Sequence, residues 1–421
     1  MAMIAFSVYR AFAVLFDILG TSEARVQAAT LANKEIEIIR NMPYEQVGTV
    51  GGVPPGPLIA EKTVTQGAIT FAVTTTVRNV DDPFDGTLGG SPNDLSSADY
   101  KFIEVRLACS ACSDPTVFTF STRVAPKSLE TATTNGALFI RALDANGEAV
   151  QGATVQITKS SAPVVDLSDV TDASGYLKIV DVPLAVQAYH IVVSKSGYST
   201  DQTYVASAEN PNPLKPDATV AMQTVTQISF SIDRTATAPI ESVTNVCAPV
   251  PNIAGTITGS KLIGTSPDVV KYTQNFQTDA NGSYTVSGLE WDTYAMSFAN
   301  VSHDIAGVIP LVPFSIGPGA TQNVKLGMES KNPRALLVTV KDGVTGLPLS
   351  NAVVALVGPS YNGSLTTGRG FFSQTDWSGG PGQEIMGNGT QYASQDGNVE
   401  ANAPQGEVKL VKTGSEYAPS G

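Results

Sequence analysis

The sequence predicts an α+β unit at the amino terminus, a long helix plus a small antiparallel sheet, followed by all-β sandwiches. Three observations predict this class. The first 42 residues have helical periodicity, short alternating strands between turn residues fill the chain after about residue 60, and a TDxxG motif recurs at residues 171, 278 and 375. A chain of 421 residues is also long enough for several domains, since roughly 100–200 residues per domain is typical.

The composition excludes several classes of function. The 25 basic residues are outnumbered by 38 acidic residues, which gives a net charge of −13 and no cationic surface for nucleic acid. Two histidines leave little material for histidine-based metal or acid–base chemistry. The sequence contains no P-loop, nucleophile elbow, HExxH motif or glycine-rich dinucleotide loop. We therefore expect a protein that is not an enzyme.

Residues 1–42 are expected to form one long helix with two different halves. Residues 1–19 are apolar or aromatic except for Ser7, Arg10 and Asp17, over about the length of a membrane span. Residues 21–42 are amphipathic, because apolar side chains recur there at three- and four-residue steps. Pro43 marks the expected end of the helix, since proline cannot continue the hydrogen-bond ladder.

Three interpretations of this helix remain open. A cleaved secretory signal needs a basic start, which the sequence lacks, and the helix continues through the place where cleavage should fall. A plain membrane anchor uses only the apolar half. An assembly helix, whose apolar half packs with copies of itself, uses both halves. Arg10 and Asp17 are seven residues apart on one face, so they would pair within or between packed helices, or lie at a membrane interface. The assembly surface would consist of Ile4, Phe6, Val8, Arg10, Phe12, Leu15, Phe16, Asp17 and Leu19.

The stretch ATLANKEIEIIRNMPYEQVGTVGGVP, residues 29–54, resembles the end of the long helix of type IV pilin-like proteins. Its closing IIRNMPYEQVGT is similar to bacterial minor pilins and pseudopilins in particular. The resemblance covers about residues 1–125 and implies a pilin-like unit with self-polymerisation. It also implies the inner membrane and the pilus assembly machinery as partners before assembly. The family's cleavage site and the glutamate near the mature terminus are not found, as if the chain begins inside the apolar helix.

Strands of a small antiparallel sheet are expected after a Gly/Pro linker at residues 48–57. Period-2 alternation predicts them at residues 62–66, 69–77, 100–107 and 117–124. Such a sheet would cover the amphipathic half of the helix and leave the apolar half projecting.

The segment between the second and third strands is an acidic, glycine-rich loop. Several carboxylates on such a loop suit Ca²⁺, which takes six to eight oxygen ligands in flexible geometry. The spacing is not that of an EF-hand, and the alternative is a solvated turn whose acids cap the backbone. Some pseudopilins bind calcium in this part of their fold, so the resemblance favours the candidate ligands Asp81, Asp82, Asp85, Asp94 and Asp99.

Three cysteines are present, two of them in the motif ACSAC. A zinc site would need a second pair, and a redox motif would need a βαβ context. We therefore expect Cys109 and Cys112 to form a short disulfide in an oxidising compartment. Cys247 is then a single remaining cysteine.

The chain repeats itself from about residue 131 onward. TDASG at 171–175, TDANG at 278–282 and TDWSG at 375–379 recur at offsets of 107 and 97 residues, which indicates an array of domains. The pattern is similar to the carboxypeptidase regulatory-like and collagen-adhesin B-type families, which implies immunoglobulin- or transthyretin-like sandwiches. The last sandwich is expected to be incomplete if the chain is truncated at Gly421.

Isolated aromatic residues and histidines offer only weak candidates for binding. Trp291 and Tyr294 would line a sugar-binding face or pack in a core. Phe371, Phe372 and Trp377 would form an adhesive patch on the same reasoning. His190 lies in a strand-like run and is expected to be a packed or edge histidine.

We expect five segments, namely the helix at 1–42, the sheet at 43–130, and sandwiches at 131–225, 226–330 and 331–421. The resemblances imply a structural subunit of a type IV pilus-like extracellular filament at the cell surface, membrane-inserted before assembly. Its sandwiches would provide spacing or adhesion, with a surface or carbohydrate ligand. The alternatives are a minor pilin or tip adhesin, and a membrane-anchored, non-polymerising receptor with carbohydrate-binding modules. No cofactor is required by these interpretations, although calcium is a candidate.

Overall fold

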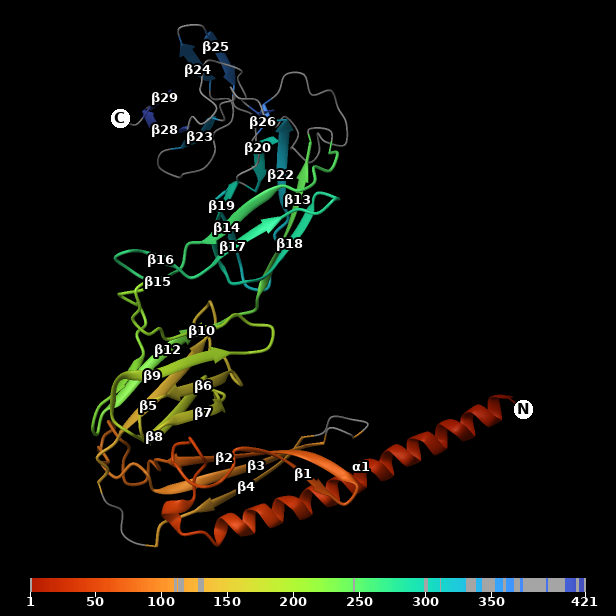
Figure 1. The fold of residues 1–421 in the computed structure, drawn as a ribbon, viewed down its shortest axis with the longest axis vertical. Helices are drawn as coiled ribbons and strands as arrows, with labels where there is room; N and C mark the ends of the chain where they lie inside the picture. Colours follow the sequence, from red (N-terminus) through yellow and green to blue (C-terminus); the bar gives the residue numbers. More distant parts are fainter. Residues whose placement is uncertain are drawn as a thin grey trace. The chain divides into compact units, whose positions relative to one another are not determined.

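The computed structural model describes most of residues 2–330 and, beyond them, only strands between residues 338 and 419. Gaps before residue 330 fall at 110–111, 113–116, 128–131, 245–246, 299–301 and 311. The chain divides into two compact units, residues 1–196 with 200–232, and residues 197–199 with 233–421 (Figure 1). Each unit is described by itself.

The described chain is predominantly β. Its helices are α1 (Ala2–Arg40) and the single 3₁₀ turn η1 (Tyr44–Gln46), and all other regular segments in the described ranges are strands. The predicted class, with an α+β pilin-like unit at the front, is therefore wrong. The reason is that the period-2 alternation typical of strands continues from residue 61 onward, so that no later described segment is a helix. The β-sandwich part of the prediction agrees with the structure.

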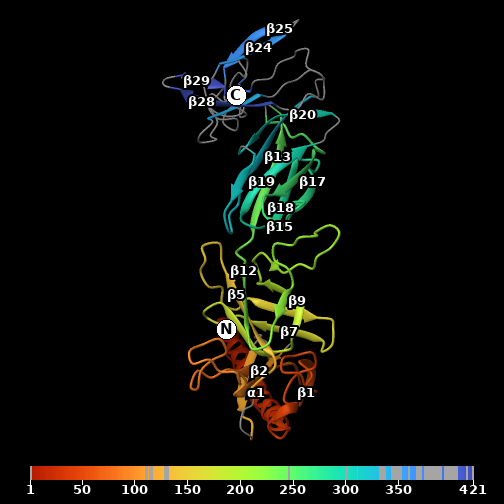
Figure 2. The same cartoon turned by 90° about the vertical axis from the view of Figure 1, so that its left-hand side faces the viewer.

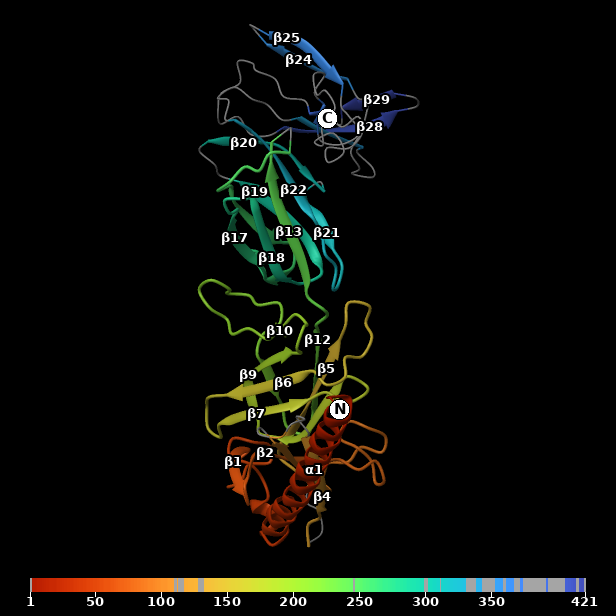
Figure 3. The ribbon, with the colours of Figure 1, turned by 90° about the vertical axis from the view of Figure 1, so that its right-hand side faces the viewer.

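The first sheet is antiparallel and packs on α1 (Figure 3). Its strands, in spatial order, are β1 (Glu61–Gln66), β2 (Ile69–Val80), β3 (Tyr100–Cys109) and β4 (Val117–Val124). One face carries the apolar side chains, because β2 and β3 alternate buried and partly exposed positions. The shared core joins this face to the helix and includes Ala28, Leu31, Ile39, Phe71, Val73, Ile103 and Val105.

The first sandwich follows in the same unit and has two sheets (Figure 2). One contains β12 (Val225–Ser231), β5 (Gly136–Leu143) and β8 (Tyr176–Val182). The other contains β10 (Asp201–Gln202), β9 (Ala185–Ser194), β6 (Thr154–Lys159) and β7 (Val165–Val170), with β11 (Ala218–Val220) paired to β9. Because β12 pairs in parallel with β5, this sandwich extends past the boundary expected at residue 225.

The second unit repeats this arrangement. One sheet has the order β18 (Ser283–Leu289), β13 (Ala236–Val243), β22 (Val324–Ser330) and β20 (His303–Ile309). The other has β17 (Thr273–Gln277), β14 (Ala254–Gly259), β19 (Asp292–Phe298) and β21 (Phe314–Ile316). A hairpin of β15 (Leu262–Gly264) and β16 (Val269–Val270) lies between β14 and β17 in sequence. The parallel pair β13–β22 corresponds to β5–β12 of the first sandwich.

Beyond residue 330 the described elements are strands. They are β23 (Val338–Asp342), β24 (Val353–Gly358), β25 (Tyr361–Thr366), β26 (Phe372–Ser373), β27 (Gln391–Tyr392), β28 (Gly406–Thr413) and β29 (Glu416–Pro419). They form the pairings β23–β28–β29, β24–β25 and β26–β27.

The TDxxG motif is one structural turn used in both sandwiches. The Oδ1 atom of Asp172 accepts hydrogen bonds from the N–H groups of Ser174 and Tyr176, at 2.8 and 2.9 Å. Gly175 follows with a φ of +74°, and a Cβ there would lie 2.6 Å from the carbonyl oxygen of Ala142. A side chain at this position would therefore be excluded by both φ and space.

The second copy of the motif has the same geometry. Asp279 accepts from the N–H groups of Asn281 and Ser283, both at 2.9 Å, and Gly282 has a φ of +69°. The preceding threonine is buried in both copies, and it connects the turn to a distant segment, since the hydroxyl of Thr278 accepts from the N–H of Ile253 at 2.9 Å.

The first sheet and the first sandwich are joined by polar and apolar contacts. The guanidinium of Arg78, on β2, donates to both carboxylate oxygens of Asp169, on β7. The side chain of Asp169 is only 5% exposed, so its carboxylate is largely desolvated, whereas the Arg78 side chain is 32% exposed. Leu88, from the loop after β2, packs with Ala137 and Val180 of the sandwich. These contacts make the sheet and the sandwich one packed body.

We expect Arg78→Met to destabilise this unit by about 3–5 kcal/mol, because it leaves the Asp169 carboxylate buried without its cation. Urea unfolding followed by circular dichroism measures the change. Arg106→Met is the control, since Arg106 is 48% exposed and lies 4.0 Å from Glu104, and its loss should cost less than about 1 kcal/mol. Equal losses of unfolding free energy in the two variants would contradict a stabilising Arg78–Asp169 ion pair.

Candidate functional site

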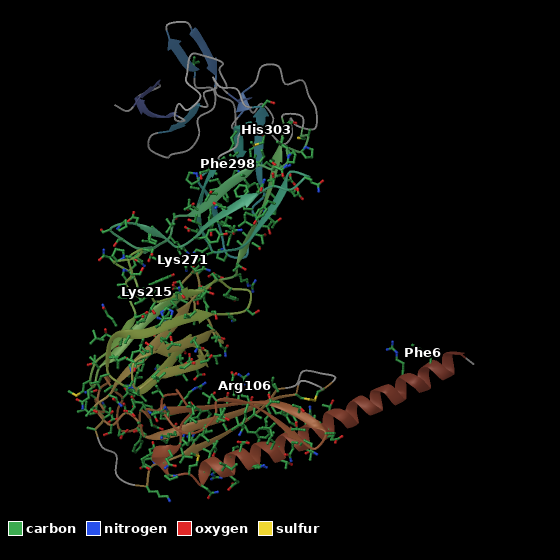
Figure 4. All side chains as sticks on the ribbon, viewed as in Figure 1. Phe6, Arg106, Lys215, Lys271, Phe298 and His303 are labelled. Atoms are coloured by element: carbon green, nitrogen blue, oxygen red, sulfur yellow. A yellow bond between two sulfur atoms is a disulfide. The ribbon has the colours of Figure 1, made fainter. Side chains whose placement is uncertain are left out.

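The helix α1 is covered by its own sheet only in its second half. Among the helix side chains that the structure describes, the first buried one is Ala24, and Ala28, Leu31 and Ile39 follow at four-, three- and eight-residue steps along one face. A Cβ built on Gly20 meets no atom within 4 Å, so the cover ends between these two positions. The helix then continues beyond the sheet toward its amino terminus (Figure 4).

Two buried charges hold the covered half in place. Glu35 faces the sheet and accepts from Lys62 Nζ at 2.7 Å. At the carboxyl end, Lys101 Nζ donates to the backbone carbonyls of Tyr44 and Val47, at 2.7 and 2.8 Å. Its ammonium also lies 4.5 Å from the centre of the Tyr44 ring. Burial lowers the pKa of Lys101 below its ordinary value.

Of the predicted assembly residues, the structure describes the side chains of Phe6 and Arg10. Both are exposed, Phe6 to 60%, and the Arg10 guanidinium lies 5.3 Å from the centre of the Phe6 ring. The side chain of Asp17 falls outside the described set, and so does the pairing expected between Arg10 and Asp17. The other side chains that fall outside the described set are Ile4, Val8, Phe12, Leu15, Phe16 and Leu19.

Within the described residues, no helix has both the length and the hydropathy that a bilayer span requires.

The acidic loop between β2 and β3 uses its carboxylates on its own backbone. Asp81 Oδ2 accepts from the N–H of Leu88 at 2.9 Å, and Asp94 Oδ1 accepts from the N–H of Ser96 at 2.8 Å. Asp82 Oδ1 accepts from the N–H of Phe84 at 3.2 Å, and Asp99 accepts from the N–H of Asp82. The side chain of Asp85 is exposed.

These carboxylates do not converge as a calcium site. Within the described ranges, no three His, Cys, Asp or Glu side chains lie close enough to hold a metal ion. Burial raises the pKa of Asp81, partly offset by its hydrogen bond from Leu88, while Asp94 and Asp85 raise it further. What the structure shows for this loop is that it places Leu88 against Ala137 and Val180 of the sandwich.

The cysteines lie in two different places. Cys109, at the end of β3, is joined to Cys112 by a disulfide with Cα atoms 5.6 Å apart. Cys247 is a free thiol in the second unit, and burial raises its pKa. This makes the thiolate less available for nucleophilic chemistry.

The remaining sequence candidates are held by neighbouring side chains. His190 Nδ1 lies 3.0 Å from Asp217, which also accepts from Thr203 Oγ1 at 2.8 Å. Trp291 lies under Lys261, whose ammonium is 3.4 Å from the ring centre. Tyr294 is fully buried in the core of the second sandwich. Phe371 and Trp377 fall outside the described residues, as does the side chain of Phe372.

Sequence reasoning did not identify Lys101 and Arg78 as positioning residues. The signal for Lys101 was available, because it alternates with Ile103 and Val105 on the apolar face of one strand. Arg78 offered no such signal, since its partner Asp169 lies 91 residues away in the sequence.

No protein-family model and no curated protein match the chain. Among solved structures, the TIE protein of Bacillus anthracis is 14% identical with a TM-score of 0.21, over 74% of this chain and 64% of that one. A streptococcal ancillary pilin is 12% identical at 0.21, over 53% and 75%. A minor pilin of Streptococcus agalactiae is 12% identical at 0.22, over 46% and 96%. This chain thus spans just under two thirds of the first of them. At such TM-scores these likenesses establish neither fold nor function.

We expect Asp81→Asn to leave the melting temperature unchanged or to raise it at pH 7. The amide oxygen still accepts from Leu88, and a partly buried charge, whose pKa Asp94 raises, is removed. The pKa of Asp81 is raised in the folded state, so its stabilising contribution is complete below the unfolded pKa and is lost as pH rises. The advantage of the variant should therefore grow from acid toward neutral pH. Differential scanning fluorimetry with CaCl₂ or EDTA measures both effects, and a calcium-dependent rise in wild type that Asp81→Asn removes would restore the metal hypothesis.

Lys101→Met should destabilise the first unit by about 1–3 kcal/mol, because the carbonyl oxygens of Tyr44 and Val47 lose a charged donor in a buried setting. Chemical denaturation measures the change. Lys127→Met is the matched control on an exposed site and should have little effect. If Lys101→Met is neutral, the lysine does not fasten the end of α1.

Proposed function

We propose that this chain is a structural subunit of a type IV pilus-like extracellular filament, which polymerises through the first half of α1. One observation carries the proposal. The sheet covers α1 from Ala24 onward, whereas Gly20 is open and Phe6 is 60% exposed. Because residues 1–19 are almost entirely apolar, this segment requires cover from outside its own unit.

The proposed mechanism is an exchange of apolar environments. The inner membrane covers residues 1–19 before assembly, and a pilus-type assembly machinery withdraws them. Neighbouring copies then bury the same side chains in the filament core, where helix packing replaces contact with lipid. A large apolar side chain such as Phe6 contributes roughly 1.5–3 kcal/mol when it is buried from water. The β-sandwiches provide spacing or adhesion at the cell surface.

The role of a subunit is favoured over that of an enzyme by the surroundings of the candidate polar groups. His190 is bonded to Asp217, and Thr203, the hydroxyl nearest to this pair, is fully buried. A nucleophile must be accessible to its substrate, so the buried Thr203 hydroxyl is better suited to holding the neighbouring segments together than to catalysis.

Deletion of residues 1–19 should abolish filaments and leave a folded protein with the β-type circular dichroism spectrum of the full chain. Negative-stain electron microscopy of cells that express the chain with a pilus machinery, using antibodies to the sandwiches, measures assembly. Filaments formed by the truncated chain would refute the mechanism. A ligand-binding full chain that never polymerises would instead favour the anchored-receptor alternative.

A pair of phenylalanine variants makes the test specific for α1. Phe6→Asp should sharply reduce filament number, because the charge would have to enter the packed helices. Phe84→Asp is the matched control, since Phe84 is 96% exposed on the acidic loop of the same unit. Equal loss with both variants would show that general surface charge, and not the helix, limits assembly.

A further inference from the structure

A polar cavity of about 500 Å³ lies inside the first unit, where the segment after α1, the first sheet and the first sandwich meet. Its size is within the usual range for small-molecule sites, roughly 300–1,000 Å³. Residues from all three parts line it, among them Tyr44, Pro54, Asn79, Lys101, Thr133 and Asp181.

Two neighbouring side chains give the cavity its chemistry. Asn79 on β2 and Lys101 on β3 are directly opposite each other in the antiparallel register, so they share one face of the sheet. Asn79 is only 6% exposed, and its Oδ1 has no hydrogen-bond partner in the described structure. A buried acceptor without a donor is costly, which indicates that something else donates to it. Two of the three ammonium hydrogens of Lys101 are donated to backbone carbonyls, and the third remains to be donated to a ligand.

The charged groups around the cavity are of both signs, with one ammonium and two carboxylates. The ammonium of Lys101 would repel a cation placed at Asn79. Glu45 and Asp181 both line the cavity and act electrostatically on Lys101, and their carboxylates would repel an anion. The carboxylate of Asp181 is fixed by Thr133 Oγ1 at 2.5 Å and Asn135 Nδ2 at 2.9 Å. A neutral ligand that both donates and accepts is therefore favoured.

Hydroxyl groups have this double capacity, and a polyhydroxylated ring also has C–H faces that can pack on apolar side chains. Pro54, Pro55 and Pro126 supply such surfaces in the same cavity, next to the Tyr44 ring. We propose that this cavity is a binding site for a neutral mono- or disaccharide, with Asn79 Oδ1 accepting from a sugar hydroxyl. The site does not depend on the proposed filament role, because it uses no residue of the projecting part of α1.

Saturation-transfer-difference NMR and calorimetric titration of the full chain test the site. The probes are glucose, galactose, mannose, N-acetylglucosamine and lactose. We expect saturable binding of at least one of them. Ala132→Trp should weaken it by more than tenfold, since Ala132 is exposed at the lining and a large ring there would occupy the cavity. Ala173→Trp, on an exposed turn elsewhere in the unit, is the matched control and should bind as wild type does.

Asn79→Ala removes the acceptor itself and should weaken binding by roughly three- to tenfold, the usual effect of one neutral hydrogen bond. Asn33→Ala, on an exposed helix position, is its control. Melting curves establish that each variant is folded. The proposal is overturned if no probe binds saturably to folded wild type, if Ala132→Trp binds as well as wild type, or if arginine amide or glucuronate binds better than the neutral sugars.

Discussion

The helix α1 has two halves, and the first sheet covers only the second of them. From Ala24 onward its small and aliphatic residues pack on β2 and β3, and Lys101 fastens its end through the carbonyls of Tyr44 and Val47. A Cβ built on Gly20 meets no atom within 4 Å, so the cover that the sheet provides does not reach this position. Under the proposed function, the apolar sequence of residues 1–19 is covered by lipid before assembly and by other copies afterwards.

The sandwiches were predictable because their signals are local. In TDxxG the aspartate accepts from two N–H groups within four residues, and the glycine takes a positive φ that most side chains avoid. Such a motif indicates a turn wherever it occurs, so its recurrence near residues 171 and 278 predicted repeated β-domains. The strand β12 was assigned to the wrong side of a boundary, because its pairing with β5 joins residues nearly 90 apart and has no local signal.

The overall class and the acidic loop were less predictable, for physical reasons of the same kind. One long helix at the front suggested an α+β unit, but the alternation that follows it never yields to another helix in the described chain. Carboxylates clustered in sequence suggested calcium, yet a carboxylate binds whatever donor the backbone places nearest. Asp81 and Asp94 meet N–H groups of their own loop, and Asp169 meets the distant Arg78. The charged residues can be read from the sequence, but their partners are determined by the fold.

The pairing of Arg78 with Asp169 also changes which parts of the chain act together. With Leu88 packed against Ala137 and Val180, the first sandwich belongs to the same body as the helix and its sheet. It therefore cannot serve as an independently placed module, and any spacing role begins beyond Ile232, where the first unit ends. The cavity lined by Asn79 and Asp181 belongs to the same unit as this junction. The contacts that join the first sandwich to the sheet therefore also bring together the parts of the chain that line the proposed binding site.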